Sequence, residues 1–182
     1  MSIILETKRL ILKRIALSHF DDLLALRSDP EVMKYIGDGS IQTKEEVENF
    51  IQCSLTTGYY EKYGLDFFSV YEKETGDFVG QAGLFHVGFN VKQDDIELAY
   101  RLHTKYWNLG YATELAKALI NYGFNKLSLP KIIAAVRPEN ERSKRVLEKA
   151  GMSYIGIVDF RGNLWPCYEI YNKQLDVSST KK

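Results

Sequence analysis

Two segments between residues 96 and 151 carry residues that could bind a phosphorylated ligand. In the first, residues 107–113 (WNLGYAT), Gly110 and Ala112 stand where a helix is expected to begin. Backbone N–H groups at a helix start can approach an anion closely, and the helix dipole adds roughly half a positive charge there. Neither a Gly-Lys-Ser/Thr sequence nor a three-glycine dinucleotide pattern is present. The segment predicts a pyrophosphate cradle, although close packing of the helix on a sheet would require the same small residues.

The second segment, residues 137–151 (RPENERSKRVLEKAG), holds five basic residues and three acidic ones. This local excess of positive charge suits a phosphorylated cofactor. Asn140 is a good N-terminal cap for the helix that follows, and Ser143 lies in the first turn, where it could also simply be solvated. Each of the two segments follows a predicted apolar strand and leads into a predicted helix. We therefore interpret them together as one cofactor site.

The sequence gives no indication of a metal site or a disulfide. Its two cysteines, Cys53 and Cys167, are far apart, and no C-x-x-C or H-E-x-x-H spacing occurs. We therefore expect neither zinc nor a disulfide framework. Cys53 is expected in the core of a helix, and Cys167 follows Pro166 at the start of a strand.

The composition is that of an ordinary globular protein of 182 residues, with 45% hydrophobic and 26% charged residues. Lys plus Arg equals Asp plus Glu at 24 each, which argues against a general nucleic-acid binder, because such proteins carry an excess of basic residues. No apolar run reaches ~18 residues, and the N-terminus lacks the apolar core of a signal peptide. We expect a cytoplasmic protein without membrane contact, with one domain at 1–175 and a short flexible tail at 176–182.

The spacing of apolar residues predicts the elements that must position the two segments. Strands are predicted at residues 7–16, 67–72, 78–87, 96–102, 131–136, 154–160 and 168–175. Helices are predicted from Ser18 to a stop at Asp29-Pro30, from a Thr43–Glu46 capping box to Leu55, at 110–127 and at 140–150. Hairpins and strand–helix–strand units are mixed in this order, which indicates an α+β or mixed α/β sheet with helices on both faces.

Taken together, residues 96–102, residues 107–113 and the pattern PEN-x-x-S-x-x-VLEK-x-G at 138–151 resemble the GNAT superfamily of acetyl-CoA-dependent N-acetyltransferases. Within it, the chain is similar to the ribosomal-protein N-terminal (serine or alanine) acetyltransferases, which residues 6–12 and 29–32 and the Gly37-Asp38-Gly39 loop also fit. The resemblance covers about residues 5–175. One departure is Trp107, where the superfamily pattern has Gln or Arg; this departure is usual in the ribosomal-type branch.

The resemblance implies a GNAT-like fold, with a mostly antiparallel sheet of six to seven strands flanked by about four helices. The sheet would splay between the strands that end near Leu102 and Val136. Acetyl-CoA would lie in that opening, its pantetheine arm paired with backbone around Tyr100 and Leu102 and contacted by Asn140, with Ser143 close to the sulfur. The pyrophosphate would be held by backbone amides of Asn108, Leu109, Gly110, Tyr111, Ala112 and Thr113.

The implied reaction is attack of an amine on the thioester carbonyl, helped by a backbone N–H of strand 96–102 at the oxyanion. Direct attack is favoured, since neither cysteine lies in the motifs. Two carboxylates, Asp159 and Glu97, compete as general base, and each could instead be a solvated or ion-paired strand residue. Ser143 is our candidate for protonating or positioning the thiolate, with Tyr154 as the alternative acid.

Three functions are consistent with the sequence. The first is acetylation of a primary amine, with a protein N-terminal α-amino group as the leading acceptor; its pKa of ~7.7–8 demands less of a base than lysine does. The second is acetylation of a small amine such as a polyamine, an aminoglycoside or an amino-acid analogue. The third is a non-catalytic acyl-CoA-binding module. The resemblance also implies a homodimer.

Overall fold

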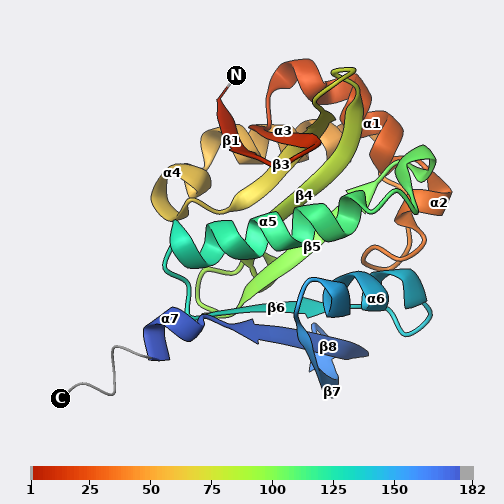
Figure 1. Cartoon of the computed structure of the whole chain (residues 1–182). Coiled ribbons are helices and arrows are strands. Elements are labelled where there is room, and N and C mark those ends of the chain that lie inside the picture. Colours follow the sequence, from red (N-terminus) through yellow and green to blue (C-terminus); the bar gives the residue numbers. More distant parts are fainter. Residues whose placement is uncertain (1, 177–182) are drawn as a thin grey trace.

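One sheet of eight strands forms the centre of the molecule (Figure 1), in the order β1-β2-β3-β4-β5-β6-β8-β7. The computed structural model describes residues 2–176, so the predicted tail lies outside the described residues except for Asp176. All neighbouring strands are antiparallel except β5 and β6. This confirms the mixed α+β fold, with slightly more strands than expected. The strands are β1 (Ile3–Glu6), β2 (Leu10–Arg14), β3 (Asp66–Glu72), β4 (Phe78–His86), β5 (Ile96–Leu102), β6 (Lys131–Ala135), β7 (Ser153–Phe160) and β8 (Asn163–Tyr171).

The helices of eight residues or more are the four that the apolar spacing predicts: α1 (Phe20–Arg27), α3 (Lys44–Thr56), α5 (Tyr111–Asn125) and α6 (Glu141–Lys149). Figure 1 shows α5 crossing one face of the sheet over β4 and β5, with α1 and α3 on the other face. Shorter helices are α2 (Pro30–Met33), α4 (Tyr59–Tyr63) and α7 (Lys173–Asp176), with 3-10 turns at 17–19, 87–89 and 104–106. Within residues 2–176, every helix is too short or too polar to cross a lipid bilayer.

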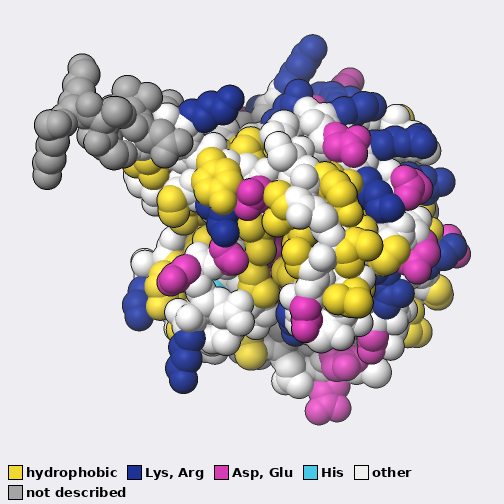
Figure 2. All heavy atoms as spheres, turned by 90° about the horizontal axis from the view of Figure 1, so that it is seen from below, with side chains coloured by type: hydrophobic (Ala, Val, Ile, Leu, Met, Phe, Trp, Pro, Cys, Tyr) yellow, Lys and Arg dark blue, Asp and Glu magenta, His cyan; other side chains and the backbone are white. Residues whose placement is uncertain are grey.

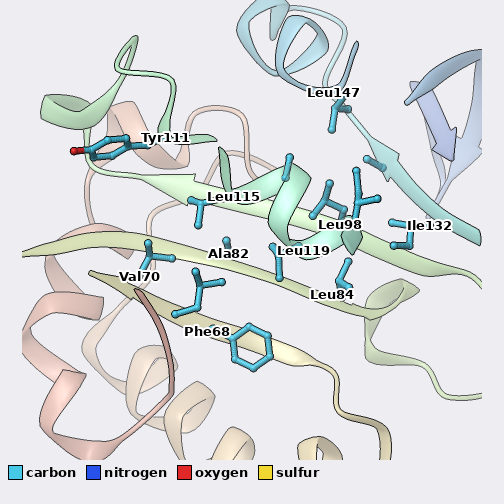
Figure 3. Packing of buried hydrophobic residues seen from close by; sticks show 14 of the residues in the cluster. Phe68, Val70, Ala82, Leu84, Leu98, Tyr111, Leu115, Leu119, Ile132 and Leu147 are labelled. Carbon is cyan, nitrogen blue, oxygen red and sulfur yellow. The ribbon is translucent and has the colours of Figure 1, made fainter. Parts of the chain in front are cut away.

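The main core lies between α5 and the sheet (Figure 3), where Leu115 and Leu119 point from the helix toward Ala82 and Leu84 of β4. Both helix leucines are fully buried, and burying a leucine stabilises the fold by roughly 1.5–3 kcal/mol. Gly123 lets the helix approach the sheet, because a Cβ there would lie 2.8 Å from Cδ1 of Ile132. This packing fixes the start of α5 beside the end of β5.

The sheet opens between β5 and β6. Their parallel ladder consists of one residue pair, Glu97 opposite Ile133, whereas β6 pairs with β8 along its whole length. In Figure 1 the two strands lie close at one end and diverge toward the end where α6 lies. The expected splay between Leu102 and Val136 is therefore present in the sheet.

Four features of the elements differ from the predictions or add to them. Strand β1 was not predicted, and β8 begins at Asn163 rather than at 168 and ends at Tyr171, before α7. Pro166 lies inside β8, where its carbonyl accepts the N–H of Val136; a proline weakens the sequence pattern of a strand. A helix does end before Asp29-Pro30, as predicted, but Pro30 also occupies the first turn of the next helix, α2. Asp29 caps α2 by accepting the N–H of Glu31. Cys53 lies on α3 but is exposed rather than in the core.

Some hydrophobic side chains stay on the surface, over the middle of the face that Figure 2 shows from below, with charges of both signs around them. The exposed hydrophobic residues of β7 and β8 are Tyr154, Ile155, Ile157, Leu164 and Tyr171. β7 is also the last strand of the sheet order. The implied homodimer stays a prediction.

Candidate active site

Two cavities meet at the opening between β5 and β6. The smaller cavity, of about 330 Å³, lies beside the 107–113 segment and α6. The larger cavity, of about 690 Å³, lies over β5 and the neighbouring strands and is closed partly by the Tyr35–Asp38 loop. Residues shared by both linings mark the junction: Tyr35, Ile36, Tyr100, Arg101, Asn140 and Ser143. A ligand in the smaller cavity can therefore reach a second ligand in the larger one.

The start of α5 presents free backbone donors to the smaller cavity. Gly110 caps the helix in the left-handed conformation, with φ of 81°, and no side chain caps this end. The first intrahelical bond runs from Glu114 N–H to the Gly110 carbonyl. The N–H groups of residues 111–113 therefore have no acceptor within the helix and can bind an anion.

The positive charge around these donors also favours binding of an anion. Arg142, Arg145 and Lys149 line the smaller cavity from α6. The one acidic residue in the first turn of α5, Glu114, is neutralised by Arg9, whose Nη2 lies 2.7 Å from its Oε2. Free N–H groups with a cationic rim fit a pyrophosphate-bearing ligand such as coenzyme A.

Trp107, the residue that departs from the superfamily pattern, attaches the loop to the sheet. Its indole N–H donates to the carbonyl of Leu102 at 2.8 Å, and the guanidinium of Arg142 lies 4.9 Å from the centre of its ring. All predicted cofactor residues line the smaller cavity except Leu109, whose carbonyl instead accepts a hydrogen bond from Arg9. The structure thus brings together Tyr100, Leu102, Asn108, Gly110, Tyr111, Ala112, Thr113, Asn140 and Ser143.

At the junction of the cavities, two hydroxyl groups are hydrogen-bonded. The Tyr100 Oη lies 2.8 Å from the Ser143 Oγ, and the backbone N–H of Ser143 donates to Asn140 Oδ1, the cap of α6. Burial raises the pKa of Tyr100, so its hydroxyl stays protonated at neutral pH. The pair can deliver a proton to a group that acquires negative charge between the cavities.

The backbone of β5 also faces the opening. The backbone N–H of His103 donates to the carbonyl of Val79 in β4. Backbone N–H and C=O groups of successive residues point to opposite sides of a strand. The backbone groups of Tyr100 and Leu102 therefore point away from β4, toward the side where β6 has diverged. This leaves main-chain groups of Tyr100 free to pair with an extended ligand.

Glu97 lies at the other end of β5 and lines the larger cavity. Burial raises its pKa to about 7, opposed by the positive charges of Arg161 and Arg101. A carboxyl group with a pKa near the working pH is well suited to act as a general base.

The structure does not bring Asp159 to either cavity. This residue is exposed on β7, and its Oδ1 accepts the N–H of Gly162 in the β7–β8 turn at 2.8 Å. Tyr154, the alternative acid, also lines neither cavity and packs its ring 5.5 Å from that of Tyr168. Cys167 is buried in a separate apolar cluster. Within residues 2–176, no three His, Cys, Asp or Glu side chains are grouped to hold a metal ion.

Two arginines of the larger cavity were not anticipated. Arg101 lies on the same face of β5 as Glu97 and Ala99, and the core leucines lie on the opposite face. Arg27 interrupts the apolar stripe of α1. For Arg27 the sequence contains a usable indication, because a charged residue stands among apolar residues of the helix that are buried.

Comparison with known proteins agrees with this geometry. Residues 9–153 match the family model described as acetyltransferase (GNAT) domain. An uncharacterized N-acetyltransferase of Bacillus subtilis, YoaA, is 32% identical over 155 residues, which cover 85% of each chain.

Solved structures with this fold include enzymes named for different acceptors. A ribosomal-protein-S5-alanine acetyltransferase from Vibrio fischeri superposes with a TM-score of 0.74 at 18% identity, covering 93% of this chain and 96% of that one. A spermidine N-acetyltransferase from Vibrio cholerae, solved with CoA and spermine, gives a TM-score of 0.70 at 18% identity, covering 90% and 95%. At these identities the likeness shows the fold alone.

Proposed function

The chain belongs to the GNAT family of acetyl-CoA-dependent N-acetyltransferases, and from this premise we propose that it acetylates an α-amino group held in the larger cavity. The observation that carries the proposal is the junction of the two cavities at Tyr100 and Ser143, with Glu97 lining the acceptor side. A donor site, an acceptor site, a base and a proton donor are then all present in one opening.

Acetyl-CoA, which supplies the acetyl group as a thioester, is assigned to the smaller cavity. Residues 111–113 would donate their free N–H groups to the pyrophosphate, and the cationic residues of α6 would lie around the phosphates. The main chain of Tyr100 would pair with the pantetheine arm, with Asn140 beside it. A backbone N–H of β5 at the opening would stabilise the carbonyl oxygen as it gains charge.

Glu97 is our choice for the base. The amine must lose a proton as its nitrogen attacks the carbonyl, and a carboxyl group with a pKa of about 7 is partly ionised at neutral pH. An α-amino group, with a pKa of ~7.7–8, suits such a base better than a lysine side chain does. Direct attack is favoured because neither cysteine lines a cavity.

Ser143 and Tyr100 are proposed to protonate the departing thiolate. Ser143 faces both cavities, and Tyr100 can replace the proton that the serine gives up, because their oxygens lie 2.8 Å apart. A protein N-terminus and a free amino acid both present an α-amino group and are the acceptors we would test first.

The test is release of free thiol from acetyl-CoA in the presence of N-terminal peptides, amino acids and spermidine, over pH 5.5–9. We expect turnover with α-amino groups, and kcat/KM rising as pH rises through about 7, since Glu97 must be deprotonated to act. Glu97→Gln should lower kcat/KM by about 100-fold and remove the inflection near pH 7.

Glu169→Gln is the matched control, because this strand carboxylate lines neither cavity. Binding of coenzyme A without thiol release for any amine would instead identify a non-catalytic binding module. Unchanged kcat/KM in Glu97→Gln would remove Glu97 from the mechanism.

A further inference from the structure

The larger cavity contains more positive than negative charge. Four arginines line it, namely Arg27, Arg101, Arg137 and Arg161, against the two carboxylates Glu97 and Asp38. The whole chain, in contrast, has a formal net charge of zero. The arginines come from α1, from β5, from the end of β6 and from the β7–β8 turn. Folding therefore concentrates cationic groups at the proposed acceptor site.

Arg27 is buried, and no carboxylate among residues 2–176 forms an ion pair with it, although the charge of Asp66 acts on it from a greater distance. Its residue is 3% exposed, and its guanidinium donates to two neutral amides, Gln81 Oε1 at 2.8 Å and Gln42 Oε1 at 2.7 Å. The remaining nitrogen, Nη2, is buried and has no partner among residues 2–176. The guanidinium carbon lies 3.6 Å from the centre of the Phe50 ring. A full positive charge is thus held in a largely apolar place.

Arg101 is half-buried in the same cavity. Its Nε is buried without a partner among the described residues, and its one hydrogen-bond contact is a weak one, from Nη1 to the sulfur of Met33 at 3.5 Å. Within that same part of the chain, no ion pair joins it to a carboxylate. Its guanidinium carbon lies 5.1 Å from the centre of the Phe67 ring. Both arginines therefore flank the same phenylalanine.

The strand register shows where Arg101 points. Phe67 is opposite Gly83, which is opposite Ala99, and the next row toward the open end of β5 contains Gln81 and Arg101. Since its guanidinium lies near Phe67, the side chain of Arg101 leans back toward Ala99 and Glu97. Gly83 and Ala99 have small or no side chains, which leaves room above them between Glu97 and the arginines.

Buried guanidinium groups are costly unless an anion pairs with them. Glu97 acts on Arg101 through its charge but forms no ion pair with it, so a further negative group would complete this cavity. Carboxylates bind arginine through two parallel hydrogen bonds. The rest of the lining includes the aromatic rings of Phe50, Phe67, Phe85 and Phe89.

We propose that the acceptor is a primary amine that also carries a carboxylate, with its nitrogen toward Glu97 and its carboxylate on Arg27 and Arg101. This inference rests on the proposed function and names the substrate class within it. It disfavours polyamines, because a second cationic group would lie beside the positive charges of Arg27 and Arg101. The aromatic lining favours acceptors whose connecting part is apolar.

The experiment compares acceptors in which a carboxylate is exchanged for an amide, with each kcat/KM expressed per neutral amine because the exchange also lowers the pKa of a nearby amino group. The pairs are phenylalanine with phenylalaninamide, the dipeptide Ala-Phe with its C-terminal amide, and the C-terminally amidated dipeptides Ala-Glu and Ala-Gln. They separate an α-carboxylate, a distant carboxylate and a side-chain carboxylate as sources of the same group. We expect at least one carboxylate to exceed its uncharged partner by about 30-fold or more in kcat/KM, because unpaired buried groups reject the analogue. Calorimetric binding to the protein saturated with coenzyme A should show the same preference.

Arg101→Gln should bring the carboxylate-to-amide ratio of kcat/KM down to about 1, and this ratio is the readout because the substitution also removes a charge that acts on Glu97 and so changes the rate with both partners. Because Arg101 is half-buried, the exposed rim residue Arg161 provides a second variant that disturbs the packing less: Arg161→Gln should weaken the preference. The control is Arg14→Gln, whose guanidinium pairs with Glu61 and lines neither cavity. Equal acetylation of carboxylates and amides would overturn this inference and leave the proposed function intact. Failure to acetylate any amine would overturn both.

Discussion

At the residue scale, the hydrogen bond between Tyr100 and Ser143 joins two side chains that line both cavities. The tyrosine hydroxyl is buried, and the serine is held by the cap of α6, so both groups have fixed positions. Neither residue needs to be ionised in the resting protein. Their proposed roles as a relay lead to a prediction that separates a proton path from ordinary packing.

Tyr100→Phe and Ser143→Ala should each lower kcat by about 10- to 100-fold and change the KM for acetyl-CoA little. If the two hydroxyls act in series, the double variant should be no slower than the slower single variant. Steady-state kinetics on all four proteins measures this coupling. Tyr154→Phe is the control, because Tyr154 is exposed and lines neither cavity. Additive losses would show that the hydroxyls act independently.

Sequence reasoning narrowed the base to Glu97 and Asp159 but could not choose between them. Both are carboxylates at strand positions, and their difference is the burial that the rest of the chain imposes. The positive charges of Arg161 and Arg101 partly offset the rise in the pKa of Glu97. Arg161 is distant in the sequence, and Arg101 lies at the far end of the same strand. Periodicity along β5 places Arg101 on the face of Glu97, but it carries no information about Arg161 or about the burial of Glu97.

At the element scale, the start of α5 combines a left-handed glycine with an uncapped first turn. Asn108 also has a positive φ, of 63°, so the loop approaches the helix through two residues of this conformation. The geometry directs backbone N–H groups into the smaller cavity rather than toward a capping side chain.

Gly110→Ala should raise the KM for acetyl-CoA by about 10-fold, because an alanine is strained by roughly 1–2 kcal/mol at this φ and the loop will shift to relieve it. Gly76→Ala is a close control: its φ is +77° against +81°, and a Cβ there meets nothing within 4 Å. Both variants should lose similar stability in thermal unfolding. Only Gly110→Ala should bind coenzyme A more weakly, and equal affinities in the two would argue against the cradle.

Most elements near the site could be predicted, for physical reasons that are visible in their residues. The Thr43–Glu46 capping box is formed as expected, and the apolar stripe of α5 faces the core. The short β1 was missed because four residues give little periodicity, and β8 was misplaced because of Pro166. The opening between β5 and β6 depends on how two distant segments pair, and only the family resemblance indicated it.

At the scale of the whole molecule, the charged residues are unevenly distributed although the formal net charge is zero. The described structure gathers four arginines in one cavity, and three cationic residues of α6 line the other. Composition excluded a general polyanion binder but could not show these local excesses. Glu97, a half-buried carboxyl group of the larger cavity, should therefore influence the stability of the whole fold.

Glu97→Gln should stabilise the protein above neutral pH. The folded pKa is about 7 against an ordinary value of 4.5, so between these pH values the folded chain binds more protons than the unfolded chain. Stability is then lost as pH rises from about 4.5 to 7, and the penalty is complete above 7. Glutamine removes the charge, so the free energy of unfolding should be on the order of 1–3 kcal/mol higher than in the parent protein at pH 8, and equal to it near pH 4.5.

Urea unfolding of the parent, Glu97→Gln and the control Glu169→Gln at both pH values measures this difference. The control variant should follow the parent, because Glu169 lies outside both cavities. A stability difference that does not change with pH would mean that Glu97 ionises at its ordinary value. In that case Glu97 would already be charged at acidic pH, and the rise of kcat/KM through about pH 7 would have to come from another group, such as the acceptor amine itself.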